Sequence, residues 1–530
     1  MQHVGATGEE SGVHLLECLQ RIPVDQLKRI IQSTGIETEG GQAEQLLADR
    51  LLNRSWLKEL LDGLSEEEWA ALKVVFFNGG DQGITVELCH QIVNLLSGKR
   101  RKSPARAVED LQNRGLIYPR TQNYRQVFFI PTDLMGALGD ILHRQMVHRI
   151  CLQEGEAVRP AAPERDLVED IHRFLAYVYK NEITLTQQGQ VFKRHMRALL
   201  DLLNMAGEDE ESLVGRYPEP LGLLVGYGLD RRLAMREDGR LLPSPTLSEW
   251  VEQPMGVKQL DLFRYWQDRY FYQDLQTFLS VMRTVGLQWL SVSRLVAEVE
   301  PLINPSQRGS FLLRLKHHLS TFLAPLGLCD LGQTGPLDEP ELACRVTQAG
   351  LAVLEGAAPD VAGPGGALAQ PALLLQATFE AIVPRPVPPK VLWNLELMAD
   401  LIRRTDRTLT YRLGRQSVYR ALKTGLSGEE ILGFLAAHSG TGVPQNVAFD
   451  LKSWADSFGQ VYLQSVTILR CASPILAQQV KASRRTARFV VGELSPTDLI
   501  VREPEYKDLL EALEADGLMP RPGIDRPGHE

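Results

Sequence analysis

The chain has 530 residues, of which 44% are hydrophobic and 23% charged, and its 57 Lys and Arg face 66 Asp and Glu for a net charge of -9. This composition is typical of a globular protein and excludes a disordered chain, a collagen-like fibre and a long coiled coil. The length predicts roughly three to four domains. Because the chain is acidic overall, any nucleic-acid contact must come from local basic patches.

The six cysteines are spread along the chain without a C-x-x-C pair, which is typical of a reduced intracellular protein. Residues 1–12 contain neither the basic nor the apolar part of a secretory signal. No run of 18 apolar residues exists, so a membrane span is not expected. We therefore expect a soluble, cytoplasmic protein that does not contact a membrane.

Residues 1–60 predict a helical segment, and residues 61–154 predict a winged-helix-like module. In this module Ser65 is an N-cap followed by acidic residues, and Ser103-Pro104 opens another helix. Three helices and then two short strands are expected at residues 65–78, 85–96, 104–113, 116–118 and 126–130. Three helices followed by a β-hairpin is the order of a winged helix, in which the third helix enters the major groove and the wing touches phosphates.

A similar order recurs at residues 258–355, with helices at 290–299 and 308–323 before two strand-like runs. Residues 166–250 predict a third module of this kind on weaker patterns, namely a helix at 167–179 and a basic helix at 192–203. The first 350 residues thus predict two or three small α-rich modules with short wings.

Residues 356–371 contain Gly and Pro too densely for a helix or strand and predict a linker. Residues 372–520 then predict an α+β domain, and residues 521–530 a flexible tail. Within this domain we expect helices and strands at residues 373–382, 388–402, 408–413, 415–422, 427–438, 451–458, 461–469, 474–482, 499–501 and 504–515. The whole chain is therefore expected to be of the α+β class.

The sequence lacks the motifs of common enzyme classes. A phosphate-binding loop needs G-x-x-x-x-G-K-[ST], but Gly98-Lys99 is followed by Arg100, and Val93 stands where the first glycine is required. No zinc-finger spacing, H-E-x-x-H or G-x-S-x-G is present. We therefore expect a protein that is not an enzyme, with no catalytic residues, cofactor, metal or small-molecule substrate.

Positive charge is gathered in three segments of the chain. Residues 99–125 hold eight basic and two acidic residues, and residues 403–423 hold seven basic and one acidic. A third, smaller cluster spans residues 481–488. From the first two clusters, the candidate DNA-binding residues are Lys99, Arg100, Arg101, Lys102, Arg106, Arg120, Arg125, Arg412, Arg415 and Arg420.

Each of these features has a second interpretation. A charge run can be a solvated face, winged helices also dock proteins, and Glu109 and Asp110 on the third helix oppose tight insertion into a groove. The aromatic stretch at residues 263–272 could stack on bases or pack a helix against its own module.

The C-terminal domain resembles the N-terminal, helicase-associated domain of XPB-type DNA helicases. The resemblance covers roughly residues 373–520 and is carried by Tyr411-Arg412-Leu413, Ser417-Val418-Tyr419-Arg420-Ala421-Leu422, Gly425-Leu426, Ile431-Leu432, Leu435, His438-Ser439, Gly442-Val443-Pro444, Trp454 and Gly459-Gln460-Val461. In that family an ATPase follows the domain, and in this chain we expect none. The chain is more similar to stand-alone bacterial proteins that carry this domain behind winged-helix-like segments.

The resemblance implies docking to a partner subunit and proximity to DNA, and it supplies no catalytic residues. We expect a non-catalytic DNA-binding or helicase-associated protein in DNA repair or transcription. Its partners would be duplex DNA and a helicase or a transcription or repair subunit. The alternative is a protein–protein adaptor that docks such a subunit without touching DNA.

Overall fold

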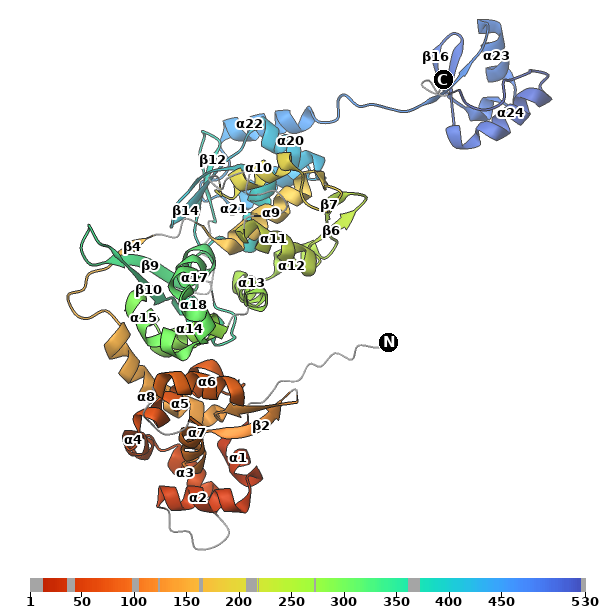
Figure 1. The fold of residues 1–530 in the computed structure, drawn as a ribbon. Helices are drawn as coiled ribbons and strands as arrows, with labels where there is room; N and C mark the ends of the chain where they lie inside the picture. Colours follow the sequence, from red (N-terminus) through yellow and green to blue (C-terminus); the bar gives the residue numbers. More distant parts are fainter. Residues whose placement is uncertain are drawn as a thin grey trace. The chain divides into compact units, whose positions relative to one another are not determined.

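The computed structural model describes residues 13–35, 43–97, 104–122, 124–161, 165–205, 217, 219–270, 273–360 and 372–525. The chain forms two compact units, residues 1–455 and 456–530. Both combine helices with small antiparallel sheets, so the chain is of the α+β class (Figure 1). Within the described ranges, no helix is both long and apolar enough to cross a membrane.

Four short helices precede the first sheet. Leu15, Leu19, Ile30 and Leu47 lie on their buried sides and pack into the core of the following segment. Asn53 caps the fourth helix by accepting hydrogen bonds from the backbone N–H groups of residues 55 and 56. The helices are α1 (Leu15–Arg21), α2 (Val24–Thr34), α3 (Ala43–Leu51) and α4 (Arg54–Asp62).

The next segment has the helix and strand order that the sequence predicts. Ser65 and Glu68 form a capping box at the start of its first helix. A short strand after that helix pairs with the second strand of the hairpin, so the sheet order is β1-β3-β2. The elements are α5 (Glu66–Asn78), β1 (Ile84–Thr85), α6 (Val86–Ser97), α7 (Pro104–Asn113), β2 (Tyr118–Gln122) and β3 (Arg125–Phe129).

The same order occurs twice more, and each time the short strand pairs with the second hairpin strand. We call these three segments the first, second and third repeats. The second repeat comprises α9 (Leu167–Lys180), β5 (Ile183–Thr184), α10 (Lys193–Leu202), α11 (Glu219–Asp230), β6 (Ala234–Glu237) and β7 (Arg240–Pro243). The third comprises α14 (Gln273–Val285), β8 (Leu290–Ser291), α15 (Val292–Val299), α17 (Phe311–His318), β9 (Cys329–Thr334) and β10 (Glu341–Val346).

Connecting elements join the repeats into one hydrophobic core that runs from Leu15 to Val353. Phe263, Tyr265 and Trp266 are buried in it, so this part of the aromatic stretch packs the core and offers no face to bases. Phe271 and Tyr272 lie outside the described residues. The connecting elements are α8 (Thr132–Ile150), β4 (Arg159–Ala161), α12 (Leu247–Glu252), α13 (Met255–Arg269), η2 (Glu300–Leu302), α16 (Pro305–Arg308), η3 (Leu319–Leu323) and α18 (Gln348–Leu354).

Residues 372–455 have a core of their own around a sheet of order β11-β12-β14-β13. The helix predicted at residues 388–402 ends at Met398, and the prediction is wrong beyond it. Thr405 accepts a hydrogen bond from the backbone of Thr408 in a turn that folds residues 400–404 back as a strand. The elements are β11 (Leu374–Leu375), β12 (Glu380–Pro384), α19 (Pro389–Met398), β13 (Asp400–Arg404), β14 (Thr408–Arg412), α20 (Arg415–Lys423), α21 (Gly428–His438) and α22 (Gln445–Asp456).

The second unit has a separate small core that includes Phe489, Leu499 and Leu509. The strand predicted at residues 461–469 begins only at Thr467, because the four residues of β17 offer pairing only to residues 467–470. The domain predicted at residues 372–520 therefore contains two cores. The elements of this unit are β15 (Thr467–Arg470), α23 (Pro474–Ala482), η4 (Ala487–Phe489), β16 (Val490–Ser495), β17 (Asp498–Val501), η5 (Glu503–Glu505) and α24 (Tyr506–Ala515).

A buried charge network joins α9 of the second repeat to residues 372–455. At its centre is Arg173, which donates to Asp170 (2.8 Å), Glu169 (3.1 Å) and Glu396 of α19 (3.1 Å). Tyr411 of β14 donates to the same oxygen of Glu396 at 2.6 Å. Burial by itself lowers the pKa of Arg173, but the surrounding acids, Glu396 foremost, raise it well above its ordinary value.

Three further arginines complete this network, which we call the α9 network. Arg385 donates to Glu169 at 2.8 Å and to Asp166 at 2.7 Å. Arg404 lies 3.4 Å from Asp170, and Arg165 lies 3.4 Å from the same carboxylate. Four arginines thus face four carboxylates, so the buried charge is balanced.

A second buried polar cluster lies between α9, α12 and α13. The ammonium of Lys258 donates to the carbonyl of Val251 at 2.9 Å, contacts Nε2 of His172 at 3.1 Å and lies 4.4 Å from the ring centroid of Trp250. Nδ1 of His172 lies 2.7 Å from the carbonyl of Val168, which leaves Nε2 as the acceptor for the lysine. Burial lowers the pKa of Lys258 to about 7 and that of His172 to about 3.

We expect Arg173→Met to lower the free energy of unfolding by about 3–5 kcal/mol, because it leaves buried carboxylates without their central cation. The matched control is Arg412→Met, which removes an exposed arginine that pairs with Glu380 at 2.7 Å and should cost less than about 1 kcal/mol. Urea unfolding followed by tryptophan fluorescence measures both. Equal losses in the two variants would contradict the role given to the α9 network.

The Lys258 cluster predicts a pH dependence of stability. In the folded chain Lys258 loses its proton near pH 7, whereas its ordinary pKa is 10.5, so between these values the unfolded chain binds more protons. The free energy of unfolding should therefore rise from pH 7 to pH 9 by up to about 1.4 kcal/mol per pH unit through this residue. Lys258→Met should lose that rise, and Lys28→Met, at an exposed position on α2, should keep it. Unfolding curves at several pH values measure this dependence. An unchanged slope of unfolding free energy against pH in Lys258→Met would refute the prediction.

Candidate nucleic-acid interface

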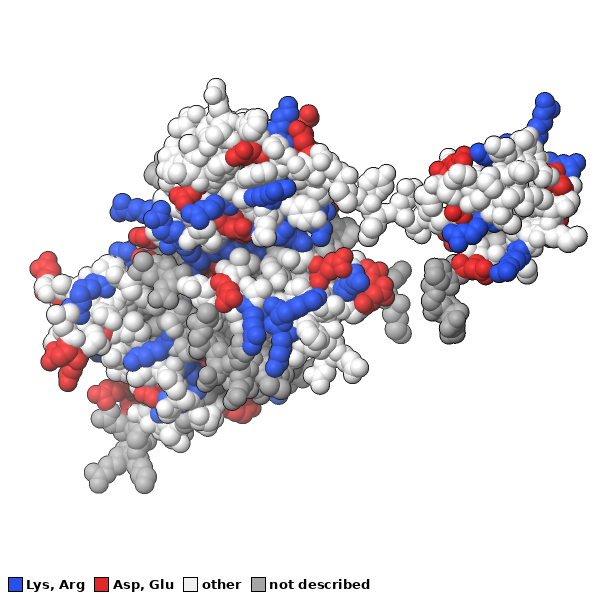
Figure 2. Space-filling view, turned by 90° about the horizontal axis from the view of Figure 1, so that it is seen from above, with Lys and Arg blue, Asp and Glu red and all other residues white. Residues whose placement is uncertain are grey.

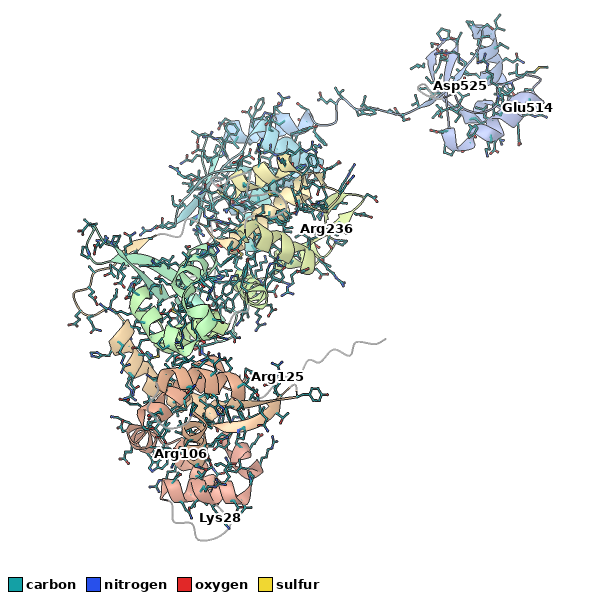
Figure 3. The ribbon with its side chains drawn as sticks, viewed as in Figure 1. Lys28, Arg106, Arg125, Arg236, Glu514 and Asp525 are labelled. Atoms are coloured by element: carbon teal, nitrogen blue, oxygen red, sulfur yellow. The ribbon has the colours of Figure 1, made fainter. Side chains whose placement is uncertain are left out.

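The first basic cluster is only partly described by the structure. Lys99, Arg100, Arg101 and Lys102 lie outside the described residues. Arg106 is exposed on α7, and Arg125 is exposed at the start of β3 in the hairpin. Figure 3 shows these two side chains on separate parts of the first repeat. Neither forms an ion pair with any described residue.

Arg120, the other candidate in this hairpin, has a structural role. Its guanidinium donates to the carbonyl of Gln82 at 2.6 Å and lies 4.7 Å from the ring centroid of Phe129. These contacts fasten β2 to the turn at residues 79–83. A phosphate could bind Arg120 only at the expense of these contacts, so it is a poorer candidate than Arg125.

The third helix of the first repeat is held on two sides. Its buried residues Ala107, Val108 and Leu111 face the core, and α2 packs along another side. Ser33 of α2 donates to the carbonyl of Asn113 at 2.7 Å, and Arg29 lies 3.8 Å from Glu109. Because α2 occupies this side, α7 is hindered from entering a major groove along its length, and Arg106 is its exposed cation.

The structure divides the second cluster between three environments. Arg404 belongs to the buried α9 network. Arg412 pairs with Glu380 at 2.7 Å, and Arg420 pairs with Asp400. Arg415 is exposed and has no ion pair with a described residue. Of the three candidates chosen from this cluster, Arg415 is therefore the one available to a ligand.

Arg415 begins an exposed row on α20. Tyr419 and Lys423 follow it at intervals of four residues, so the three lie on one side of the helix. Tyr419 is 53% exposed, and the ammonium of Lys423 lies 6.0 Å from its ring centroid. Basic residues beside an exposed aromatic ring are typical of nucleic-acid surfaces. Tyr419 was missed by charge counting, although its spacing from Arg415 is visible in the sequence.

The third cluster lies in the unit formed by residues 456–530, and two of its four cations pair with carboxylates. Lys481 pairs with Glu493 at 2.6 Å, and Arg485 lies 3.8 Å from Asp516. Arg488 lies against the ring of Phe489, 4.6 Å from its centroid. The sequence segregates positive charge along the chain, whereas in the fold much of it is paired with carboxylates.

Other exposed basic residues lie where sequence reasoning placed no site. Arg236 of β6, Lys193 and Arg194 of α10 are exposed in the second repeat, and Figure 3 labels Arg236. In Figure 2, Lys and Arg side chains are spread over the face shown, with Asp and Glu among them. On the face shown, positive side chains therefore alternate with negative ones.

A cleft of about 920 Å³ lies between the first and third repeats. Three arginines line it, Arg125 from the hairpin, Arg264 from α13 and Arg283 from α14, together with one carboxylate, Asp81. Side-chain amides and hydroxyls complete the polar part of its lining. These polar residues are Asn78, Gln82, Thr85, Gln122, Gln267, Gln276 and Ser280. The cleft combines Arg125 with two arginines more than 100 positions further along the chain, which explains why the sequence did not reveal it.

Two of the possible reactive groups, Cys89 and Lys258, are enclosed. Burial raises the pKa of the Cys89 thiol to about 12, and Lys258 is held by its partners in the core. Among the described residues, no group of three or more His, Cys, Asp or Glu side chains is arranged to hold a metal ion.

The comparisons with known proteins concern the C-terminal part. Residues 373–495 match the family model described as the helicase conserved C-terminal domain. No curated protein matches the chain. The family match covers less than half of the chain and includes Tyr411 and the rest of the block that carries the resemblance stated above. Residues 373–495 are therefore supported as a helicase-associated domain, and their assignment to the XPB type stays a prediction.

Proposed function

We propose that this protein is a non-catalytic, helicase-associated DNA-binding protein that works in DNA repair or transcription. The helix–strand–helix–helix–hairpin order of its three repeats supports the prediction of winged-helix-like modules. The family match at residues 373–495 supports association with helicases. The XPB-like resemblance supports the setting in repair or transcription.

The observation that carries the proposal is a set of exposed arginines without ion pairs among the described residues. Arg106 and Arg125 lie in the first repeat, and Arg415 begins the exposed row on α20. An unpaired guanidinium binds phosphate oxygens through a planar set of donors and releases counterions when it does so. The sequence between α6 and α7 of the first repeat also contains Lys99, Arg100, Arg101 and Lys102, which add four positive charges.

The non-catalytic part of the proposal rests on the motif scan and on the burial of Lys258. The phosphate-binding loop is broken at Val93 and Arg100. Lys258, whose lowered pKa would suit a nucleophile, is 1% exposed and makes three contacts in the core. A substrate could not reach it without unfolding α12 and α13.

The test is duplex binding over a salt series. The triple variant Arg106→Ala, Arg125→Ala, Arg415→Ala should weaken binding equally for all sequences, because phosphate contacts carry no sequence information. Each arginine that no longer binds a phosphate should reduce the slope of log K against log salt by about 0.9. Fluorescence anisotropy with a labelled duplex measures both quantities.

The control carries the same change in net charge. In Arg231→Ala, Arg412→Ala, Arg420→Ala each removed arginine pairs with a carboxylate, with Asp261, Glu380 and Asp400 respectively. This variant should bind with close to the wild-type slope. Absence of wild-type binding at about 50 mM salt, or a flat slope, would refute DNA binding.

The alternative function, a protein–protein adaptor, is favoured by a different observation. Val461, Tyr462 and Leu463 precede β15 with exposures of 94%, 75% and 103%, and Val491 and Leu494 of β16 are exposed in the same unit. Contiguous exposed apolar side chains are typical of interaction sites. A helicase or a transcription or repair subunit would be the partner.

For the adaptor, Tyr462→Ser with Leu463→Ser should remove the capture of such a subunit. Captured proteins are identified after nuclease treatment, with Arg106→Ala as the control that leaves the apolar segment intact. Recovery that depends on nucleic acid, or that survives the double substitution, would contradict this alternative.

A further inference from the structure

The turn between β2 and β3 of the first repeat contains a residue that the turn itself does not favour. Gln122 pairs with Arg125, so two residues separate the strands. Two-residue turns with a positive φ at the second position favour glycine there. That position holds Tyr124, with φ 61°, a left-handed conformation that is disfavoured for a bulky side chain. Turn chemistry therefore does not account for this tyrosine.

The second repeat offers a comparison within the same chain. In its hairpin Glu237 pairs with Arg240, so two residues again separate the strands. These residues are Asp238 and Gly239, with φ 47° and 70°. Asp-Gly is one of the pairs that this turn favours. The first repeat thus has a tyrosine where the equivalent turn of the second repeat has a glycine.

The side chain of Tyr124 is exposed over its whole surface. Its exposed fraction is 103%, and it forms no hydrogen bond or ring contact with another described residue. The other rings of the hairpin, those of Tyr118, Phe128 and Phe129, are buried. Packing against the described residues therefore does not offset the strained backbone of Tyr124. Such a residue is a candidate for a contact with a ligand.

The hairpin that carries Tyr124 is held in place on the first repeat. Its second strand pairs with both β1 and β2. Arg120 of β2 donates to the carbonyl of Gln82 at 2.6 Å and lies 4.7 Å from the ring centroid of Phe129. In Figure 1 the hairpin, labelled at β2, extends beyond the helices of the first repeat. The turn is therefore presented to a ligand on a supported strand pair.

The charge beside Tyr124 fits a polyanion. Residues 118–129 contain two arginines, Arg120 and Arg125, and no acidic residue. Arg125 is exposed and has no ion pair with a described residue, although Asp81 lines the same cleft. An exposed aromatic ring next to an available guanidinium is suited to bind a base face and a phosphate together.

We propose that Tyr124 stacks on the open face of the last base pair at the end of a DNA duplex, while Arg125 binds a phosphate of that end. The inference rests on the proposed DNA-binding function and names the part of the duplex that this hairpin contacts. Inside a duplex the base faces cover one another, so a ring can stack only where the duplex ends. Proteins that follow a single strand use several rings for successive bases, whereas this hairpin exposes one.

The decisive variant is Tyr124→Gly in the full chain, which gives the first repeat the glycine of the second. With a short, labelled, blunt-ended duplex we expect about a tenfold loss of affinity, as for the loss of one base–aromatic stack. The slope of log K against log salt should not change, because the ring carries no charge. Tyr124→Trp keeps a stacking face and should bind as the wild type does.

A stability measurement and a control exclude a general loss of structure. Glycine adopts a positive φ without strain, so Tyr124→Gly should unfold at a midpoint no lower than that of the wild type. A lower midpoint would show that the ring supports the fold and would overturn the inference. The matched control is Tyr462→Gly, which removes a ring that is 75% exposed outside the repeats and should leave duplex affinity unchanged.

A second measurement locates the contact on the DNA. Two duplexes carry the fluorescent base 2-aminopurine, one at the terminal base pair and one at the centre. The wild-type protein should change the fluorescence of the terminal base and not that of the central base, because stacking alters this fluorescence. Tyr124→Gly should lose the change at the terminal position.

The outcomes separate this inference from the proposed function. Duplex binding that is equal in the wild type and Tyr124→Gly, or that leaves the terminal 2-aminopurine unchanged, would overturn the inference alone. Absence of duplex binding would overturn both. A single strand of the same length that binds more tightly than the duplex, and that also depends on Tyr124, would assign the ring to single strands and overturn the duplex-end assignment.

Discussion

The rest of the structure depends on the electrostatic constraint at Arg173. Charges removed from water are tolerated only when opposite charges and hydrogen bonds surround them, and here four arginines and four carboxylates meet at the boundary between α9 and residues 372–455. Moving either side by a few ångströms would leave several of these groups unpaired at once. Residues 372–455 are therefore fixed on the second repeat, and the surfaces of these two parts must be considered together.

The contacts between α9 and residues 372–455 also determine which basic side chains are available to bind a ligand. Arg385 and Arg404 hold the two parts together, and Arg412 and Arg420 are balanced by nearby carboxylates, so the basic segment at residues 403–423 presents Arg403, Arg407 and the row on α20. In the first repeat, Arg120 and the packing of α2 on α7 have a comparable effect. The basic side chains that stay available form small, separate sites on the repeats. Such sites fit the proposed contact with a nucleic-acid backbone at several points better than they fit the recognition of a base sequence by one helix.

Local signals in the sequence predicted local structure well. The N-cap at Ser65, the helix starts and the order of the first repeat are all present, because each depends on residues within one turn or hairpin. The predictions failed where the deciding partner is distant: residues 400–404 become a strand because β14 folds onto them, and the strand expected from residue 461 lacks a partner before Thr467. For the same reason a run of arginines could be counted, but the pairing of Arg404 with Glu169 and Asp170 could not be predicted. The cleft residues, gathered from both ends of the first 356 residues, carried no contiguous signal.

The family match and the compact units divide the chain differently. The matched stretch starts in one unit, passes into the other and stops at Ser495, the last residue of β16. The strand that pairs with both β15 and β16 is β17, just beyond that point, and the partner that neutralises Glu396 lies more than 200 residues upstream. The stretch that matches the family model is therefore not a stretch that can fold alone. A fragment of residues 373–495 would lack β17, the middle strand of its last sheet, and Arg173, the guanidinium that pairs with the buried Glu396.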